Sequence, residues 1–285
     1  MKNILIVTDT TSGFTIEKAE KSEVYLLPLS VIVEKEEYKD LYEMSAPALY
    51  EHDRQRKNLT TSQPNLGYLL NTMGEWKEKN YEHIIVITLA TTLSGTYQAI
   101  KMTAEELDIT NITIIDSLLV GSPMMEASIQ AVAMVKEGKS VAEIVENCQH
   151  IFSNTTTFAL PETLDNLKRG GRITGAAAAM SNLLKIKPLL YLENQNGTVE
   201  KHSVHRTESS VFKTIIKEYL DKGIKKETHK FYLLHADAEE ILQRFVLVMN
   251  DDFPEIEYEI INLPAVLTTH TGVGTFGIQS VLKRQ

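Results

Sequence analysis

The sequence predicts an α/β protein, with an N-terminal domain built on a parallel sheet flanked by helices and a C-terminal α+β domain built on a mixed or antiparallel sheet. Its 285 residues correspond to about two domains at roughly 150 residues per domain. Apolar runs alternate with helical patterns in the first half, whereas a hairpin and interspersed helices follow residue 152. We therefore expect one domain over residues 1–152 and a second over residues 153–285.

Strand–helix alternation in the first half indicates a parallel sheet covered on both faces. Three short apolar runs are typical of buried strands: residues 3–7, 84–89 and 112–115. Two helical patterns alternate with them: residues 96–107 and 124–135. Pro28 interrupts a fourth apolar run at residues 25–33, which predicts an edge strand or a bent strand.

The second half predicts paired strands and amphipathic helices. Residues 187–193 and 198–205 read as a β-hairpin, with Asn196 and Gly197 supplying the turn. A helix, a strand, a helix and a strand are then expected, in this order: residues 209–220, 230–235, 238–249 and 255–262. The residues after Asn262 are expected to form a short tail.

Composition limits the possible partners. The net charge of -9, with no basic run to offset it, makes nucleic acid an improbable partner and allows at most transient contact with a membrane. No apolar stretch approaches the roughly 18 residues of a membrane span. The single cysteine, Cys148, agrees with a reducing compartment. We therefore expect a cytoplasmic protein.

Hydroxyl groups collect just after the predicted strands. Asp9-Thr-Thr-Ser follows the first strand, Thr91 to Thr96 follow the second, and Asp116-Ser117 follows the third. A separate loop over residues 60–64 adds more hydroxyls. The carboxyl ends of parallel strands form the binding crevice of such folds, and a helix N-terminus favours anions. For any one of these loops, ordinary helix capping or a turn is the better explanation. Because three such loops lie at one edge of the sheet, binding and capping both remain open.

Four other readings fail on context. Gly272-x-Gly274-x-x-Gly277 leaves no room for a dinucleotide-binding unit. Ser94 lacks the first glycine of a nucleophile elbow, and Asp9 lacks the second aspartate of aspartyl phosphatases. His202 and His205 are expected on opposite faces of a strand, which disfavours a metal site.

In order, the motifs resemble the DegV family of bacterial fatty-acid-binding proteins over essentially the whole chain. The motifs that carry this resemblance are Asp9-Thr-Thr-Ser12, Thr61-Ser-Gln-Pro64, Leu93-Ser-Gly-Thr-Tyr97, Asp116-Ser117, Gly170-Gly-Arg-Ile173, Lys187-Pro188, Arg206-Thr207 and His270-x-Gly272-x-Gly274.

The resemblance implies a binding subunit without catalytic residues or cofactor. One long-chain fatty acid would lie in a tunnel between the two domains, and a partner kinase related to dihydroxyacetone kinases would phosphorylate its carboxylate to an acyl phosphate. It implies that the carboxylate is bound by Thr61, Ser62, Ser94, Gly95 and His270. It also implies that Arg206 lies near the head group or the added phosphate.

Structural alternatives stand beside these roles. His270 can be a turn histidine, Arg206 a solvated arginine, and Arg172 a structural residue. The family tends to have small residues after Asp116-Ser117, whereas residues 118–125 of this chain end in two methionines, so the tunnel is expected to differ here. Val273 stands where the family often has proline, and we expect no effect of this change on His270.

Two other functions remain open. A self-contained hydrolase or phosphotransferase would use Ser94 or Asp9, and Ser94→Ala would abolish its turnover. A lipid-sensing regulator would bind the fatty acid but would not serve a kinase as substrate donor.

Overall fold

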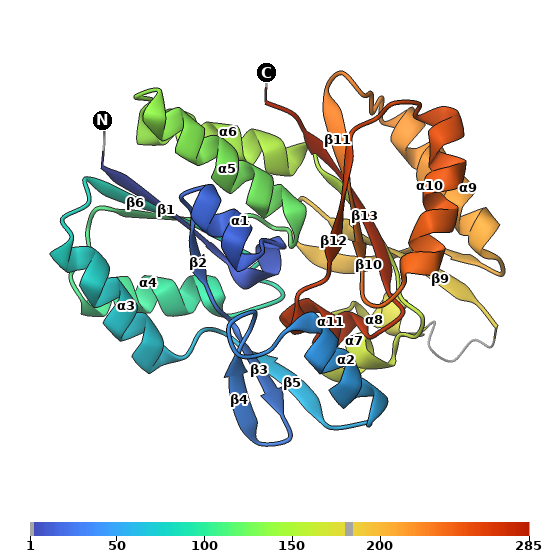
Figure 1. Cartoon of the computed structure of the whole chain (residues 1–285), viewed down its shortest axis with the longest axis horizontal. Coiled ribbons are helices and arrows are strands. Elements are labelled where there is room, and N and C mark those ends of the chain that lie inside the picture. Colours follow the sequence, from blue (N-terminus) through green and yellow to red (C-terminus); the bar gives the residue numbers. More distant parts are fainter. Residues whose placement is uncertain (1–2, 180–184, 285) are drawn as a thin grey trace.

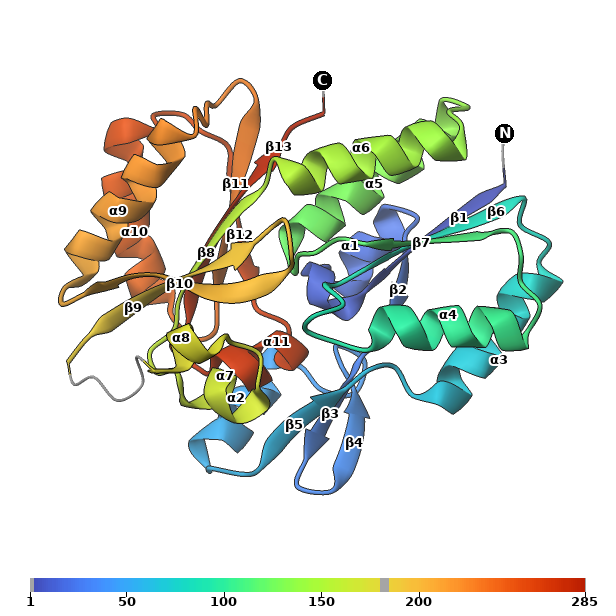
Figure 2. The same ribbon diagram turned by 180° about the vertical axis from the view of Figure 1, so that it is seen from behind.

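The computed structural model describes residues 3–179 and 185–284 (Figures 1 and 2). Its first sheet has four parallel strands in the order β2-β1-β6-β7. These strands are β1 (Ile4–Asp9), β2 (Tyr25–Leu27), β6 (His83–Thr88) and β7 (Ile112–Asp116). The three apolar runs read as parallel strands are thus confirmed, because strands covered on both faces have nearly continuous apolar sequences.

Helices cover both faces of this sheet, as predicted. Trp76 of α3 and Ile100 of α4 pack with Val7 and Val86 on one face. Met124 of α5 belongs to the core on the other face. The helices of the first half, with one short 3-10 helix, are η1 (Thr10–Ser12), α1 (Ile16–Lys21), α2 (Ala46–Arg54), α3 (Leu66–Glu78), α4 (Thr96–Glu106), α5 (Ser122–Lys136) and α6 (Val141–Ser153).

The chain leaves the parallel sheet at Pro28. β2 ends just before it as the edge strand of the first sheet, and β3 (Ser30–Val33) starts a second, antiparallel sheet with the order β4-β3-β5. The other two strands are β4 (Glu36–Lys39) and β5 (Leu59–Ser62). The prediction of a loop over residues 60–64 was therefore wrong for Thr60 to Ser62. The backbone of these three residues pairs with β3, and β-branched threonine is favoured in strands.

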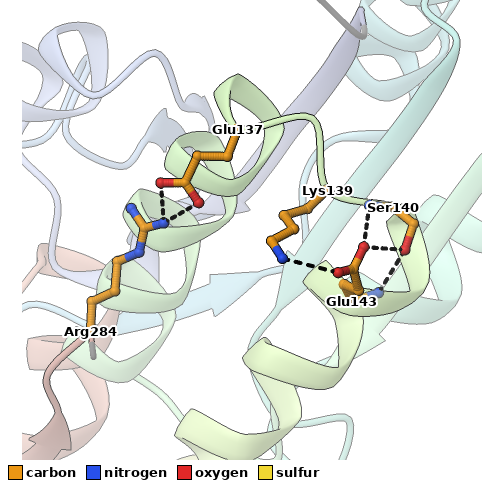
Figure 3. Close-up of polar contacts among 5 residues, drawn as sticks. All are labelled: Glu137, Lys139, Ser140, Glu143 and Arg284. Atoms are coloured by element: carbon orange, nitrogen blue, oxygen red, sulfur yellow. Dashed lines mark hydrogen bonds and ion pairs between the residues drawn. The ribbon is translucent and has the colours of Figure 1, made fainter.

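The connection between α5 and α6 is held by polar contacts (Figure 3). Ser140 and Glu143 form a reciprocal capping box that starts α6. Lys139 contacts the Glu143 carboxylate at 3.2 Å. Arg284, far away in the sequence, forms an ion pair with Glu137 at the C-cap of α5. The end of the described chain is thereby tied to the last turn of α5.

The second half builds a six-stranded mixed sheet in the order β10-β9-β8-β13-β11-β12. Only the β11–β12 pair is parallel among the pairs described. The strands are β8 (Thr156–Leu160), β9 (Lys187–Glu193), β10 (Thr198–His205), β11 (His229–His235), β12 (Tyr258–Asn262) and β13 (Phe276–Leu282). The predicted mixed sheet and the β9–β10 hairpin are confirmed.

Two long helices pack on this sheet through an aromatic core. Phe212 of α9 contacts Phe245 of α10 and Phe276 of β13. The remaining helices are α7 (Asp165–Gly170), α8 (Gly175–Ala178), α9 (Glu208–Asp221), α10 (Glu239–Asp252) and α11 (Ala265–Thr271). In the part of the chain described, no helix is long and apolar enough to cross a membrane.

The prediction of a short tail after Asn262 was wrong. Residues 265–271 form α11, and β13 lies in the middle of the six-stranded sheet. Gln279, a buried polar residue, obscured this strand in the sequence. Its side chain donates to the Val120 carbonyl at 2.8 Å and accepts from the Ser122 amide at 2.8 Å. β13 is therefore bonded to the start of α5.

The prediction that His202 and His205 face opposite ways was also wrong. A bulge between Lys201 and Ser203 breaks the alternation of β10. Both imidazoles hydrogen-bond the Ser203 hydroxyl, at 3.0 Å and 2.7 Å. No group of three or more His, Cys, Asp and Glu residues within 3–179 and 185–284 is placed to hold a metal ion.

α5 joins the two halves of the chain. Figures 1 and 2 show it, in green, running beside both β1 and the six-stranded sheet. Glu126 of α5 is buried and binds Lys230 at 2.9 Å and the Tyr232 hydroxyl at 2.8 Å, both on β11. The boundary at residue 152 stays a prediction, and one hydrophobic core runs across it.

Candidate functional site

A cavity of about 470 Å³ lies between the loops that follow β1 and β6 and the helices α7 and α11. This volume is within the roughly 300–1,000 Å³ of small-molecule sites. Its apolar lining residues are Leu29, Leu89, Leu93, Val120, Leu167, Val199, Val266 and Leu267. Its remaining lining residues are Thr11, Thr61, Ser62, Gln63, Ser94, Gly95, Arg172, His270 and Thr271. The wall thus combines a continuous set of apolar side chains with a comparable number of polar ones.

The structure brings together five of the six residues singled out in the sequence. Thr61, Ser62, Ser94, Gly95 and His270 all line this cavity. Arg206 does not, because it is exposed just beyond the end of β10. Which of these residues contact a ligand stays a prediction.

Thr61 and His270 meet although 209 residues separate them. The Thr61 hydroxyl lies 2.7 Å from Nε2 of His270, which joins β5 to α11. Burial, with Arg172 and then Arg169 nearby, lowers the pKa of His270 to about 4. The imidazole is therefore neutral at pH 7, and its Nε2 either accepts from Thr61 or donates, depending on the tautomer.

Gly170 makes room for this imidazole. A Cβ atom at Gly170 would overlap Nδ1 of His270. The next residue, Gly171, ends α7 in the left-handed region at φ 69°, where glycine is favoured. The Gly170-Gly171 pair therefore sets both the end of α7 and the position of the ring.

Ser94 and Gly95 begin α4. The Ser94 hydroxyl lies 2.9 Å from the Thr96 hydroxyl, and Gly95 is the N-cap without a side-chain cap. The Thr96 amide donates to the Ser94 hydroxyl at 3.3 Å. Because Ser94 and Gly95 line the cavity, the N-terminus of this 11-residue helix borders it, and a helix N-terminus favours an anion. A Cβ atom at Gly95 would overlap Oε1 of Gln63, so these two lining residues are also close.

Arg172 is the cation of the cavity wall, and the sequence reading treated it as structural. Its Nε donates to the Leu93 carbonyl at 3.1 Å, and its Nη1 donates to the Gly170 carbonyl. These bonds support the structural role, while its place in the wall adds a positive charge beside His270. The only feature of the sequence that marked Arg172 was its position directly after Gly170 and Gly171.

Within residues 3–179 and 185–284, no partner that would activate a nucleophile contacts Asp9 or Ser94. Asp9 accepts from the Leu89 amide at 2.8 Å and the Thr11 amide at 3.0 Å, and it lies outside the cavity lining. Burial raises its pKa to about 6. Among the hydrogen bonds of the described residues, no histidine or carboxylate contacts the Ser94 hydroxyl. This arrangement gives no support to a hydrolase using either residue.

Met124 and Met125 are fully buried in the core and do not line the cavity. Met124 stands behind the wall, with its sulfur 3.8 Å from the Thr11 hydroxyl. Val120 is the lining residue from the segment in which the sequence departs from the family pattern. That segment therefore contributes one apolar side chain to the cavity wall.

The family model described as "Uncharacterised protein, DegV family" matches residues 3–283. The chain belongs to the DegV family. A DegV domain-containing protein of Staphylococcus aureus strain N315 is 31% identical, with 100% of both chains covered. One from Listeria innocua is 30% identical, with 99% of both covered.

Two solved DegV structures are similar along almost the whole chain. A DegV family protein of Thermus thermophilus, described by its fatty acid binding, has a TM-score of 0.89 at 26% identity, covering 99% of this chain and 100% of that one. DegV of Bacillus subtilis, described as a fatty acid binding protein, has a TM-score of 0.85 at 27% identity, with the same coverage. These similarities confirm the DegV fold.

We expect the half-buried imidazole of His270 to make this DegV protein's stability depend on pH. The pKa of His270 is about 4 when folded and about 6.5 when unfolded, so the unfolded chain takes up the proton first as pH falls. Protonation of His270 therefore leaves the free energy of unfolding unchanged above about pH 6.5 and lowers it by about 3 kcal/mol toward pH 4. Asp9 and Asp40, with pKa values raised by burial to about 6 and about 7, act in the opposite direction.

Comparison with His270→Gln isolates the histidine. Urea unfolding of lipid-free protein at pH 7 and pH 4.5 measures the free energy of unfolding of both proteins. The difference between them should move by about 2.4 kcal/mol in favour of the variant at the lower pH. A difference that stays constant over this range would contradict a lowered pKa for His270.

Proposed function

We propose that this protein binds one long-chain fatty acid in the cavity and acts as a carrier, not as a catalyst. The hydrocarbon would lie along the apolar wall, and Thr61, Ser62, Ser94, Gly95 and His270 would surround the carboxylate. The observation that carries the proposal is the contact between Thr61 and His270 in an otherwise largely apolar cavity. The fatty acid binding described for the relatives from Thermus thermophilus and Bacillus subtilis supports the choice of ligand.

The alkyl chain and the carboxylate of the fatty acid would contribute to binding in different ways. Burial of an alkyl chain contributes about 0.8 kcal/mol per CH₂, or roughly 12 kcal/mol for about 16 carbons before the cost of association. A buried carboxylate is unfavourable unless hydrogen bonds compensate for its lost hydration. The hydroxyls of Thr61, Ser62 and Ser94 and the amides at Gly95 can donate those bonds. Affinity would come chiefly from the tail, and orientation from the head group.

Arg172 is the cation that we assign to the carboxylate's surroundings. It lines the cavity and lowers the pKa of His270, so its field reaches the same region. Arg206 is exposed outside the lining, and in the proposal it serves the phosphorylated product or the partner rather than the buried carboxylate. The proposal thus uses two arginines, Arg172 near the carboxylate and Arg206 outside the cavity.

The partner in this proposal is a separate kinase related to dihydroxyacetone kinases, which would convert the bound fatty acid to an acyl phosphate. Resemblance to the DegV family is the basis for this partner. The absence of a base beside Ser94 in the hydrogen bonds of the described chain favours a carrier over a self-contained hydrolase.

Native mass spectrometry of freshly purified protein tests the ligand. We expect a single bound acid of about 250–300 Da, consistent with a chain of about 16 carbons, which is released on denaturation. A mass equal to that of the bare chain, together with no fatty acid in the denatured extract, would exclude the proposal.

Ser94→Ala and His270→Ala separate retention from presentation. Because the tail supplies most of the binding, each variant should lose more kinase-dependent acyl phosphate formation than fatty acid retention. Both are measured with the same loaded protein, and Ser203→Ala, outside the cavity, serves as the control. Equal loss of both activities would contradict this division.

A further inference from the structure

The helix that carries His270 has no cap of its own. Pro264 is the N-cap of α11, and it provides no side-chain hydrogen bond. The first amides of a helix have no partner within the helix and need an acceptor from elsewhere. Val266, Leu267, His270 and Thr271 of α11 all line the cavity, so the placement of this helix sets much of its wall.

Asp40 supplies the missing acceptor from a distant part of the sequence. The Val266 amide donates to Oδ1 of Asp40 at 3.3 Å, across 226 residues. Asp40 is fully buried. It follows β4, so the contact ties α11 to the antiparallel sheet that also contains Thr61 on β5.

Asp40 is also linked to the opposite wall. Its amide donates to the Leu29 carbonyl at 2.9 Å, and the Leu29 amide donates to the Thr10 hydroxyl at 3.2 Å. Leu29 lines the cavity, as does Thr11 next to Thr10. A single buried aspartate thus fixes segments that follow β1, precede β3 and begin α11.

We propose that Asp40 is a positioning residue, which caps α11 and thereby holds His270 against Thr61. The side-chain oxygen of an Asp or Asn residue accepts the free amide at a helix N-terminus, and loss of such a cap weakens the helix. Without it, α11 would be anchored chiefly by packing, and the 2.7 Å contact between Thr61 and His270 would loosen. The effect on the ligand rests on the proposed function, whereas the effect on α11 does not.

Three variants test the capping role. Asp40→Ala removes the acceptor, Asp40→Asn retains an oxygen at Oδ1, and Glu126→Gln alters another buried carboxylate that binds Lys230 away from the cavity. Hydrogen–deuterium exchange over residues 265–271 should be about fivefold faster in Asp40→Ala and near wild type in Asp40→Asn. Glu126→Gln should lower the unfolding midpoint without changing exchange in this segment. If Asp40→Ala does not fold, Asp40→Leu, which has a similar branched shape and no acceptor, gives the same comparison.

Palmitate affinity tests the link to His270. Asp40→Ala should weaken palmitate binding about fivefold, with most of the affinity restored in Asp40→Asn. In the His270→Ala background, the same change should cost less than about twofold, because Asp40 acts through the imidazole.

Unchanged exchange over α11 in Asp40→Ala, or a loss of affinity that adds fully to that of His270→Ala, would overturn the inference. If wild-type protein binds no palmitate, the proposed function fails, while the exchange comparison still decides whether Asp40 caps α11.

Discussion

Val120→Trp is expected to weaken fatty acid binding more than a hundredfold while leaving the protein folded. Val120 lines the cavity and is only partly buried, so an indole can enter the open space. An indole that excludes about four methylenes of the ligand removes about 3 kcal/mol, which is more than a hundredfold in affinity. The measurement is displacement of a fluorescent fatty acid from the purified variant, with the unfolding midpoint recorded in parallel.

Val204→Trp is the matched control. Val204 is 39% exposed on β10 and does not line the cavity, so the same side chain should leave binding unchanged. Wild-type affinity in a folded Val120→Trp protein would show that the ligand occupies another site. Loss of binding in both variants would point to a general effect of the added indole.

Gly170→Ala is expected to weaken fatty acid binding by displacing the imidazole of His270. The new methyl group would overlap Nδ1 of the imidazole and push it away from Thr61. Loss of one hydrogen bond to a charged group costs about 2 kcal/mol, or about thirtyfold in affinity for the fatty acid. Isothermal titration with a long-chain fatty acid measures this loss, and the ring resonances of His270 report the displacement.

Gly175→Ala provides the comparison for this change. A Cβ atom at Gly175, on α8, has no atom within 4 Å, so binding should stay at the wild-type level. The prediction fails if Gly170→Ala leaves the His270 resonances in place, or if both substitutions weaken binding equally.

The parallel sheet could be predicted from the sequence because its chemistry is local. Buried strands such as β1 and β6 each contain a run of four apolar residues, and α4 and α5 show helical spacing. β13 was missed because buried Gln279 looks like a surface residue until Val120 and Ser122 are placed beside it. β5 was missed because Thr-Thr-Ser is as common in turns as in strands.

The candidate site was predictable only where motifs marked it. No spacing rule pairs Thr61 with His270, since the contact depends on how α11 folds back over β5, and the resemblance to the DegV family supplied both residues. Arg172 and Asp40 were not predicted as parts of the site, because their roles depend on burial and on partners far away in the sequence. The bulge in β10 likewise changed the sides of His202 and His205 through one extra residue.

The central position of β13 has a consequence for synthesis. Because β13 hydrogen-bonds both β8 and β11, a growing chain cannot complete the six-stranded sheet until residue 282 has left the ribosome. α11, which closes one side of the cavity, directly precedes that strand. The wall of the cavity that α11 provides can therefore take its final place only late in synthesis, when β13 joins the sheet.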